Sequence, residues 1–321
     1  MTATVPPRWR ARACAATLAT LGACGTSVAS VDDTPPVLGP PAQREFFDQA
    51  YAAAFPRQRL DLYLPPTGSG PWPVVLWIHG GGWQEGSKAL DPTDPVLRLR
   101  TRGYAVASIG YRLSGQAAFP AQIHDVKAAV RFLRQNAAGY RLNPSRMAAW
   151  GASAGGHLAA LLGTSGAVSA LEDLSMGFPT QSSRVQAVID WYGPTDFGRM
   201  DEQTAAIGCP LFPPNGHGAA DSPESRLLGA PVRSSATLVQ FANPVAYVTA
   251  DDPPFLIQHG TRDCTVPPGQ SELLQAALTR VGGAERSTLD LLTGAGHGGG
   301  AFTTAANIDR IVAFLSRALA P

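Results

Sequence analysis

A mostly parallel β-sheet flanked by helices, the α/β class, is the fold that the sequence predicts. From residue 46 onward, short apolar runs alternate with amphipathic stretches, which is typical of strands that are connected by helices. Several runs are continuously apolar, as expected of strands buried on both faces. The chain has 321 residues, 45% hydrophobic and 15% charged, so it is long enough for one large core, and its composition excludes a disordered or fibrous protein.

The apolar runs predict seven strands, at residues 59–64, 74–79, 104–109, 147–151, 185–192, 255–259 and 288–292. Ile123, Val126, Val130 and Leu133 recur at helical spacing and predict a helix between two of them. Two later segments, 273–278 and 308–319, show a similar helical pattern.

One segment interrupts the alternation. Residues 196–250 are rich in Pro, Gly and Ser, and they stand where a single crossover helix would suffice. We expect an insertion that forms a small lid on a single α/β domain spanning 45–321. A partly disordered surface loop is the alternative.

The N-terminus has the pattern of a secretory signal peptide. Residues 1–23 carry three arginines, no acidic residue and an apolar stretch too short to span a bilayer. The stretch ends at Cys24 in a sequence that looks like the lipobox of a bacterial lipoprotein, which would attach the protein to a membrane through acylated Cys24. Two alternatives are cleavage after Ala29, which would release a soluble secreted protein, and an uncleaved segment. Residues 24–44, with many prolines, are predicted to be a flexible tether.

Cys209 and Cys264 are the only cysteines beyond the predicted leader and tether. Two cysteines in an oxidising compartment usually pair, so we expect a disulfide, with two separate buried thiols as the alternative. The formal net charge is +1 and the chain contains only two lysines, so nucleic acid is not an expected partner. Neither an H-E-x-x-H nor a paired C-x-x-C motif occurs, so no metal site is expected.

A candidate nucleophile follows the strand predicted at 147–151. Residues 151–155 read GASAG, and this G-x-S-x-G run leads into a predicted helix, the setting of a nucleophile elbow. The motif needs glycines two positions before and after Ser153, because a Cβ there would collide with the neighbouring strand or helix. Residues 79–83 read HGGGW after another strand, so the backbone N–H groups of Gly81 or Gly82, with that of Ala154, could bind an oxyanion.

Asp263 and His297 follow the last two predicted strands, so the chain order is Ser, Asp, His. His297 is the only histidine after residue 263, which identifies it as the candidate base. Asp190, at the end of its own strand, is the rival to Asp263 as the acid. We expect the earlier histidines at 79, 157, 217 and 259 to be structural.

Residues 294–299 also match the dinucleotide fingerprint G-x-G-x-x-G. Only a terminal helix follows, with no second strand to complete a βαβ unit, so we interpret the run as the loop that carries His297.

Over residues 45–318, these motifs resemble the α/β-hydrolase superfamily, and within it the secreted esterases related to the bifunctional feruloyl and acetyl xylan esterase family. The strings that carry the resemblance are HGGGW at 79–83, GASAGG at 151–156, WYGPTD at 191–196, SPESRLLG at 222–229, DPPF at 252–255, HGTRD at 259–263 and GHG at 296–298. The resemblance implies hydrolysis of an ester, whether small or part of a polysaccharide, without a cofactor.

The hormone-sensitive-lipase-like esterases share the HGGG loop, but they usually carry Asp where this chain has Ala152. Trp83 and Tyr192 adjoin motif residues and are expected to bind substrate as aromatic walls, whereas Trp191 is expected in the core. Acetyl or feruloyl esters of plant polysaccharide are the preferred substrate class, and a general short-chain carboxylesterase is the nearest alternative. A prolyl-oligopeptidase-like peptidase and a non-catalytic binding protein remain further alternatives.

Overall fold

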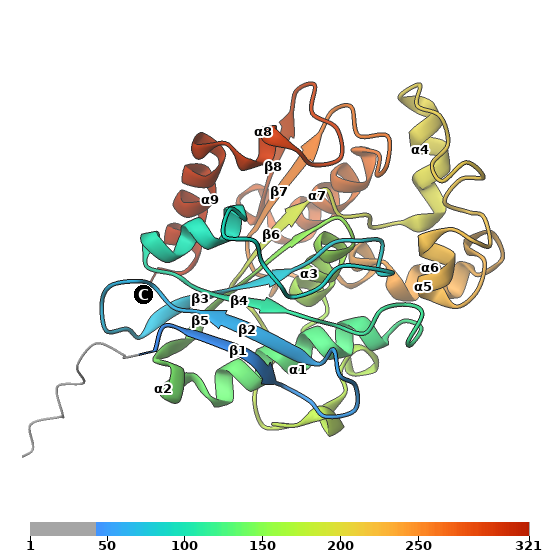
Figure 1. Cartoon of the computed structure of the whole chain (residues 1–321). Coiled ribbons are helices and arrows are strands. Elements are labelled where there is room, and N and C mark those ends of the chain that lie inside the picture. Colours follow the sequence, from blue (N-terminus) through green and yellow to red (C-terminus); the bar gives the residue numbers. More distant parts are fainter. Residues whose placement is uncertain (1–42, 321) are drawn as a thin grey trace, which may run out of the picture. The chain divides into compact units, whose positions relative to one another are not determined.

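The computed structural model describes residues 43–320, and these build an eight-stranded sheet in the order β1-β2-β4-β3-β5-β6-β7-β8 (Figure 1). β1 and β2 are antiparallel to each other, and β2 is antiparallel to β4. The remaining neighbours, in the order β4, β3, β5, β6, β7 and β8, are all parallel. The strands are β1 (Glu45–Ala50), β2 (Arg59–Tyr63), β3 (Trp72–Ile78), β4 (Ala105–Ile109), β5 (Leu142–Ala152), β6 (Ala187–Trp191), β7 (Phe255–Gly260) and β8 (Ser287–Leu292).

Helices cover both faces of the sheet. The α-helices are α1 (Ala121–Gln135), α2 (Ala137–Tyr140), α3 (Ala154–Thr164), α4 (Met200–Ala206), α5 (Pro223–Leu228), α6 (Ala236–Ala242), α7 (Gly269–Gly282), α8 (Gly300–Thr303) and α9 (Ala305–Ala318). The 3₁₀ helices are η1 (Pro95–Arg102), η2 (Ser169–Leu171), η3 (Leu174–Met176), η4 (Phe197–Arg199), η5 (Val232–Ser234), η6 (Pro244–Tyr247) and η7 (Ala284–Arg286). One core lies between the sheet and α1, α3 and α7, and the other between the sheet and η1, α8 and α9.

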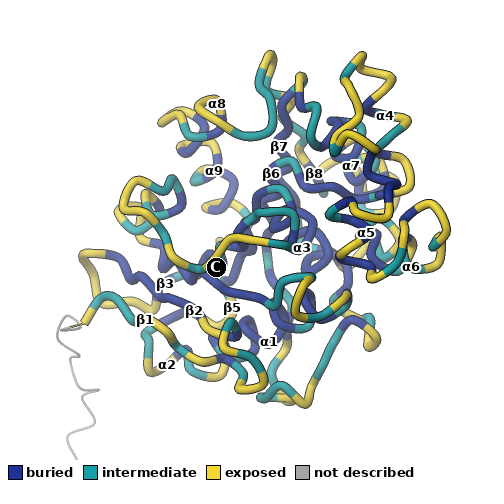
Figure 2. The backbone as a smooth tube through the Cα atoms, turned by 45° about the vertical axis from the view of Figure 1, so that its right-hand side comes forward, coloured by how far each residue is buried: buried dark blue, intermediate teal, exposed yellow. Residues whose placement is uncertain are grey.

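The alternation of side chains along β5 shows how the two faces differ. Ala149 points into the core that contains α3, while Trp150 points into the opposite core. There the Trp150 ring packs edge-to-face against Trp77 and Trp191, with centroid distances of 5.4 and 4.7 Å. Small residues on one face therefore let α3 approach the sheet, and tryptophans fill the other. Figure 2 shows the result, with the central strands and α3 buried.

All seven predicted strands and the three helices predicted by periodicity are present, which confirms the α/β class. The prediction missed β1 and placed the start of β5 at 147, whereas the strand begins at Leu142. Between β6 and β7, α4, α5, α6 and three 3₁₀ helices occupy the segment expected to form a lid (Figure 1).

The predicted signal peptide, Cys24 and almost all of the tether lie outside the described residues. Within residues 43–320, no helix combines the length and the apolar character that crossing a bilayer requires.

Candidate active site

The carboxyl ends of the parallel strands bring the motif residues to one edge of the sheet. Ile78 of β3 pairs with Gly151 of β5, and Ala152 of β5 pairs with Trp191 of β6. Each of these strands is followed at once by a sequence motif, and open α/β sheets bind ligands at this edge. The register therefore places residues from distant parts of the chain in one site.

Ser153 lies in the turn between β5 and α3 with φ 56° and ψ −121°, a strained conformation for a residue with a side chain. Its N–H donates to the carbonyl of Trp191 at 2.8 Å, which holds the turn against β6. A Cβ at Gly151 would lie 2.0 Å from the carbonyl oxygen of Gly155, and a Cβ at Gly155 would lie 2.0 Å from that of Ile78. Only glycine at both positions allows β3, the turn and α3 to pack this closely.

Ser153, His297 and Asp263 form one chain of hydrogen bonds. Nε2 of His297 lies 2.9 Å from Oγ of Ser153, and Nδ1 lies 2.6 Å from Oδ2 of Asp263. An ionised carboxylate only accepts, so Nδ1 carries a proton and Nε2 is left to accept from the serine hydroxyl. Neutral His297 in this tautomer can remove the proton of Ser153.

Asp263 is held as a buried carboxylate. Its Oδ1 accepts from the backbone N–H groups of Thr265 and Val266, each at 2.9 Å. Burial opposes ionisation, but hydrogen bonds and charge interactions with His259 and His297 outweigh it and lower the pKa of Asp263 to about 2. The group is therefore a charged acceptor at neutral pH and can stabilise a protonated His297.

The glycine loop after β3 is arranged to offer N–H groups. The carbonyl of Gly80 accepts from Nδ1 of His79 at 2.8 Å, and that of Gly81 accepts from the N–H groups of Gln84 and Glu85. Since O and H of a trans peptide point in opposite directions, the N–H groups of Gly81 and Gly82 point away from these partners. Both glycines line the cavity that also contains Ser153.

This cavity has a volume of about 530 Å³ and is bordered by the three motif loops, the Asp263 loop and the segment between β6 and β7. Ala154, the first residue of α3, also borders it. Tyr192 lies beside the triad, with its ring edge-to-face to His297 at 4.7 Å. Trp83 borders the cavity as well, but its side chain is buried against His157 and Phe197. Tyr192 is therefore the better placed of the two expected aromatic walls.

Asp190, the rival acid, lies elsewhere. Its Oδ1 accepts from the N–H of Gly193 beneath the start of α3, and burial raises its pKa to about 6. The residue that contacts His297 is Asp263.

His79, His157 and His259 make structural contacts. His79 stacks on Tyr111 at 4.3 Å, and burial lowers the pKa of both His79 and His157 to about 4. His259 lies within hydrogen-bonding distance of the carbonyl of Val266 and of the hydroxyl of Ser271.

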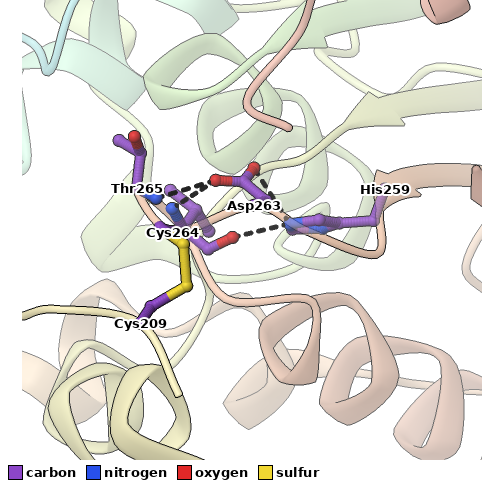
Figure 3. The surroundings of a disulfide bond; sticks show 6 residues. Cys209, His259, Asp263, Cys264 and Thr265 are labelled. Carbon is purple, nitrogen blue, oxygen red and sulfur yellow. Dashed lines mark hydrogen bonds and ion pairs between the residues drawn. A yellow bond between two sulfur atoms is a disulfide. The ribbon is translucent and has the colours of Figure 1, made fainter. Parts of the chain in front are cut away.

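Cys209 and Cys264 form a disulfide with a Cα–Cα distance of 5.5 Å (Figure 3). Cys264 directly follows Asp263, and Cys209 follows α4. The bridge therefore joins the segment between β6 and β7 to the loop that carries the acid.

Five residues of that segment border the cavity without having been identified from the sequence as site residues: Pro194, Phe212, His217, Pro223 and Glu224. The sequence placed His217 in the lid as a structural residue, and Glu224 entered only within the SPESRLLG string. Within residues 43–320, no group of three or more His, Cys, Asp or Glu side chains is arranged to hold a metal ion.

Comparison with known proteins places these features in a family. The BD-FAE family model matches residues 60–278. Esterase LipC of Mycobacterium tuberculosis is 32% identical over 271 residues, which are 83% of this chain and 63% of LipC. The chain spans about half to two thirds of the length of the first curated relatives.

Two solved structures share the fold closely. One is a bifunctional GH43-CE protein of Bacteroides eggerthii, with a TM-score of 0.77 and 34% identity over 86% of this chain and 35% of that one. The other is a truncated carbohydrate esterase from gut microbiota, with a TM-score of 0.77 and 29% identity over 88% of this chain and 100% of that one. The family model, the α/β-hydrolase arrangement and these relatives agree, and the chain belongs to the BD-FAE family.

Proposed function

We propose that the protein is a carboxylic ester hydrolase that uses Ser153, His297 and Asp263 as a catalytic triad. The observation that carries this proposal is the continuous hydrogen-bond chain from Asp263 through His297 to Ser153, next to a cavity bordered by the glycine loop. The named esterases among its relatives support the same reaction class.

In the first step, Oγ of Ser153 attacks the ester carbonyl carbon while Nε2 of His297 takes the hydroxyl proton. The carbonyl oxygen becomes an oxyanion, which the N–H groups of Ala154 and of Gly81 or Gly82 bind. Asp263 stabilises the imidazolium. When the tetrahedral intermediate collapses, His297 returns the proton to the leaving alcohol and the acyl group stays on Ser153.

Water then repeats the sequence on the acyl-enzyme. His297 accepts a proton from water as its oxygen attacks the acyl carbon, the C–O bond to Ser153 breaks, and the proton returns to the serine oxygen. The products are a carboxylic acid and free enzyme, so no co-reactant besides water is needed.

The proposed substrates are acetyl or feruloyl esters of plant polysaccharide. Tyr192 and the exposed ring of Phe212 border a cavity large enough for a sugar ring or a hydroxycinnamoyl group. One structural neighbour is a carbohydrate esterase from gut microbiota, which supports this choice. A general short-chain carboxylesterase is the second candidate, favoured by the plain esterase name of the relative LipC.

Initial rates on 4-nitrophenyl acetate, methyl ferulate and acetylated xylan test the function. Ser153→Ala should lower turnover of each hydrolysed ester by several orders of magnitude. Near wild-type turnover by this variant would refute the assignment of the nucleophile, and cleavage of dipeptidyl anilides without ester hydrolysis would favour the peptidase. Hydrolysis of 4-nitrophenyl acetate alone would select the general carboxylesterase.

We further propose that the protein is exported and anchored to a membrane through lipidated Cys24. The basic and apolar leader that ends at this cysteine supports the proposal. Labelling of the expressed protein with a palmitate analogue should be lost in Cys24→Ser. An unlabelled chain beginning at Ser30 would indicate soluble secretion.

A further inference from the structure

His217 and Glu224 form a buried ionisable pair that borders the active-site cavity. The proposed triad uses neither residue. Their side chains are 3% and 5% exposed, and Nδ1 of His217 lies 3.1 Å from Oε1 of Glu224. The second polar atom of each, Nε2 of His217 and Oε2 of Glu224, has no hydrogen-bond partner among the described residues.

The backbone around the pair is firmly held. The N–H of His217 donates to Oδ1 of Asp201 at 2.6 Å, and its carbonyl accepts from the hydroxyl of Ser222 at 2.7 Å. The Ser222 hydroxyl also accepts from the N–H of Ser225 and caps α5, which carries Glu224. The backbone that carries the two side chains is thus held by hydrogen bonds within the protein.

The pair also adjoins the glycine loop. Pro223, next to Glu224, lies so close to Gly82 that a Cβ at Gly82 would be 3.3 Å from the proline side chain. Nη1 of Arg226 on the same helix donates to Oε1 of Gln84 at 2.8 Å. A ligand group beside His217 and Glu224 would therefore lie near the loop that faces the reacting carbonyl.

The chemistry of the two atoms defines the ligand. Because Glu224 as a carboxylate only accepts, Nδ1 of His217 is the donor between them, and a neutral imidazole then presents a lone pair at Nε2. With Glu224 as a carboxylate and His217 as a neutral imidazole, both remaining atoms are acceptors, and a buried acceptor without a partner is unfavourable. We propose that His217 and Glu224 form a specificity site that binds a hydroxyl group of the substrate.

Two substrate parts could supply the hydroxyl: the sugar of the alcohol portion or the phenol of a feruloyl group. This inference rests on the proposed function, and matched esters distinguish the two sources. Methyl β-D-xyloside monoacetate is compared with cyclohexyl acetate, which keeps the six-membered ring without hydroxyls. Methyl ferulate is compared with methyl 3,4-dimethoxycinnamate, which lacks the phenol.

Glu224→Gln should lower kcat/KM for the hydroxyl-bearing ester of one pair by about tenfold, mainly through KM, because a charge-assisted hydrogen bond is replaced by a weaker neutral one. The partner ester should change less than about threefold. His217→Gln, which can still donate to Glu224 but has no imidazole lone pair, should show the same selectivity. Glu202→Gln, an exposed position on α4, serves as the matched control and should alter neither ester.

Thermal unfolding and the rate of fluorophosphonate labelling of Ser153 establish that each variant is folded. If kcat/KM falls equally for both esters of each comparison, or does not fall for any ester, the specificity site is refuted. His217 and Glu224 then have a structural role only. If the wild type hydrolyses no ester, the proposed function fails instead. Binding of methyl β-D-xyloside monoacetate and of methyl ferulate to Ser153→Ala, with and without Glu224→Gln, then still tests the site: unchanged affinity for both contradicts it.

Discussion

At the scale of single residues, two buried aspartates, Asp263 and Asp190, have sharply different environments. Burial opposes ionisation of Asp263, but hydrogen bonds and charge interactions with His259 and His297 outweigh it and lower its pKa to about 2. Asp190 receives one N–H, and burial raises its pKa to about 6. Asp263 follows a predicted strand and Asp190 lies at the end of another, so the sequence identifies two candidates. Only the hydrogen-bond partners separate the catalytic candidate from the structural residue.

Asp190→Asn should stabilise the protein at neutral pH. The folded-state pKa of Asp190 is above the unfolded value, so wild-type stability from this group is present below about pH 4 and is lost as the pH rises through about 6. A shift of about two pKa units corresponds to about 3 kcal/mol. Urea unfolding should therefore show a gain for the variant that grows between pH 4 and pH 6 and is constant above pH 7. A gain independent of pH would contradict the assignment of a charged, buried Asp190.

At the scale of elements, tight packing between β3, the Ser153 turn and α3 sets the position of Ser153. Gly155→Ala would place its Cβ 2.0 Å from the carbonyl oxygen of Ile78, so the elbow must move away from β3. We expect a loss of about 3 kcal/mol in the free energy of unfolding, with a large fall in kcat. Urea unfolding and 4-nitrophenyl acetate turnover measure the two effects.

Gly139→Ala provides the matched control, because a Cβ at this position in α2 meets nothing within 4 Å. Its free energy of unfolding should change by less than about 1 kcal/mol, and its turnover should not change. Similar behaviour of the two variants would show that the close approach at Gly155 is unimportant.

The disulfide links two elements whose sequence separation is 55 residues. Replacing Cys209 and Cys264 by serine should lower the free energy of unfolding by up to about 4 kcal/mol, because the unfolded chain regains loop entropy. Fluorophosphonate labelling of Ser153 at 25 °C should stay within about threefold of wild type, since Thr265, Val266 and His259 still hold Asp263. Loss of labelling in a folded double variant would show that the bridge itself positions the acid.

At the scale of the whole molecule, most of the fold could be predicted because the central strands are buried on both faces and therefore appear as uninterrupted apolar runs. β1 could not be recognised, since it is an edge strand with a register irregularity between Phe46 and Gln49 and it carries exposed residues within an apolar stretch. The helices α4, α5 and α6 have only six or seven residues each, too few to display a helical period.

The triad candidates could be identified from the sequence because each lies in the turn or loop after a strand and the chain order of the three is characteristic. His217 and Glu224 could not, since the loop path that brings them to the cavity depends on hydrogen bonds of His217 with Asp201 and Ser222. The SPESRLLG string contains Ser222 and Glu224 but does not indicate these contacts. The burial of Trp83 could not be predicted either, because the HGGGW string indicates a glycine turn but not the direction of the indole ring.

Mass spectrometry of the protein after reaction with a fluorophosphonate tests the central claim most directly. The account predicts one adduct per chain, on the peptide that contains Ser153, with labelling slowed at least about a thousandfold in His297→Ala and abolished in Ser153→Ala. An adduct on a different residue, or wild-type labelling of Ser153 in the absence of His297, would contradict it.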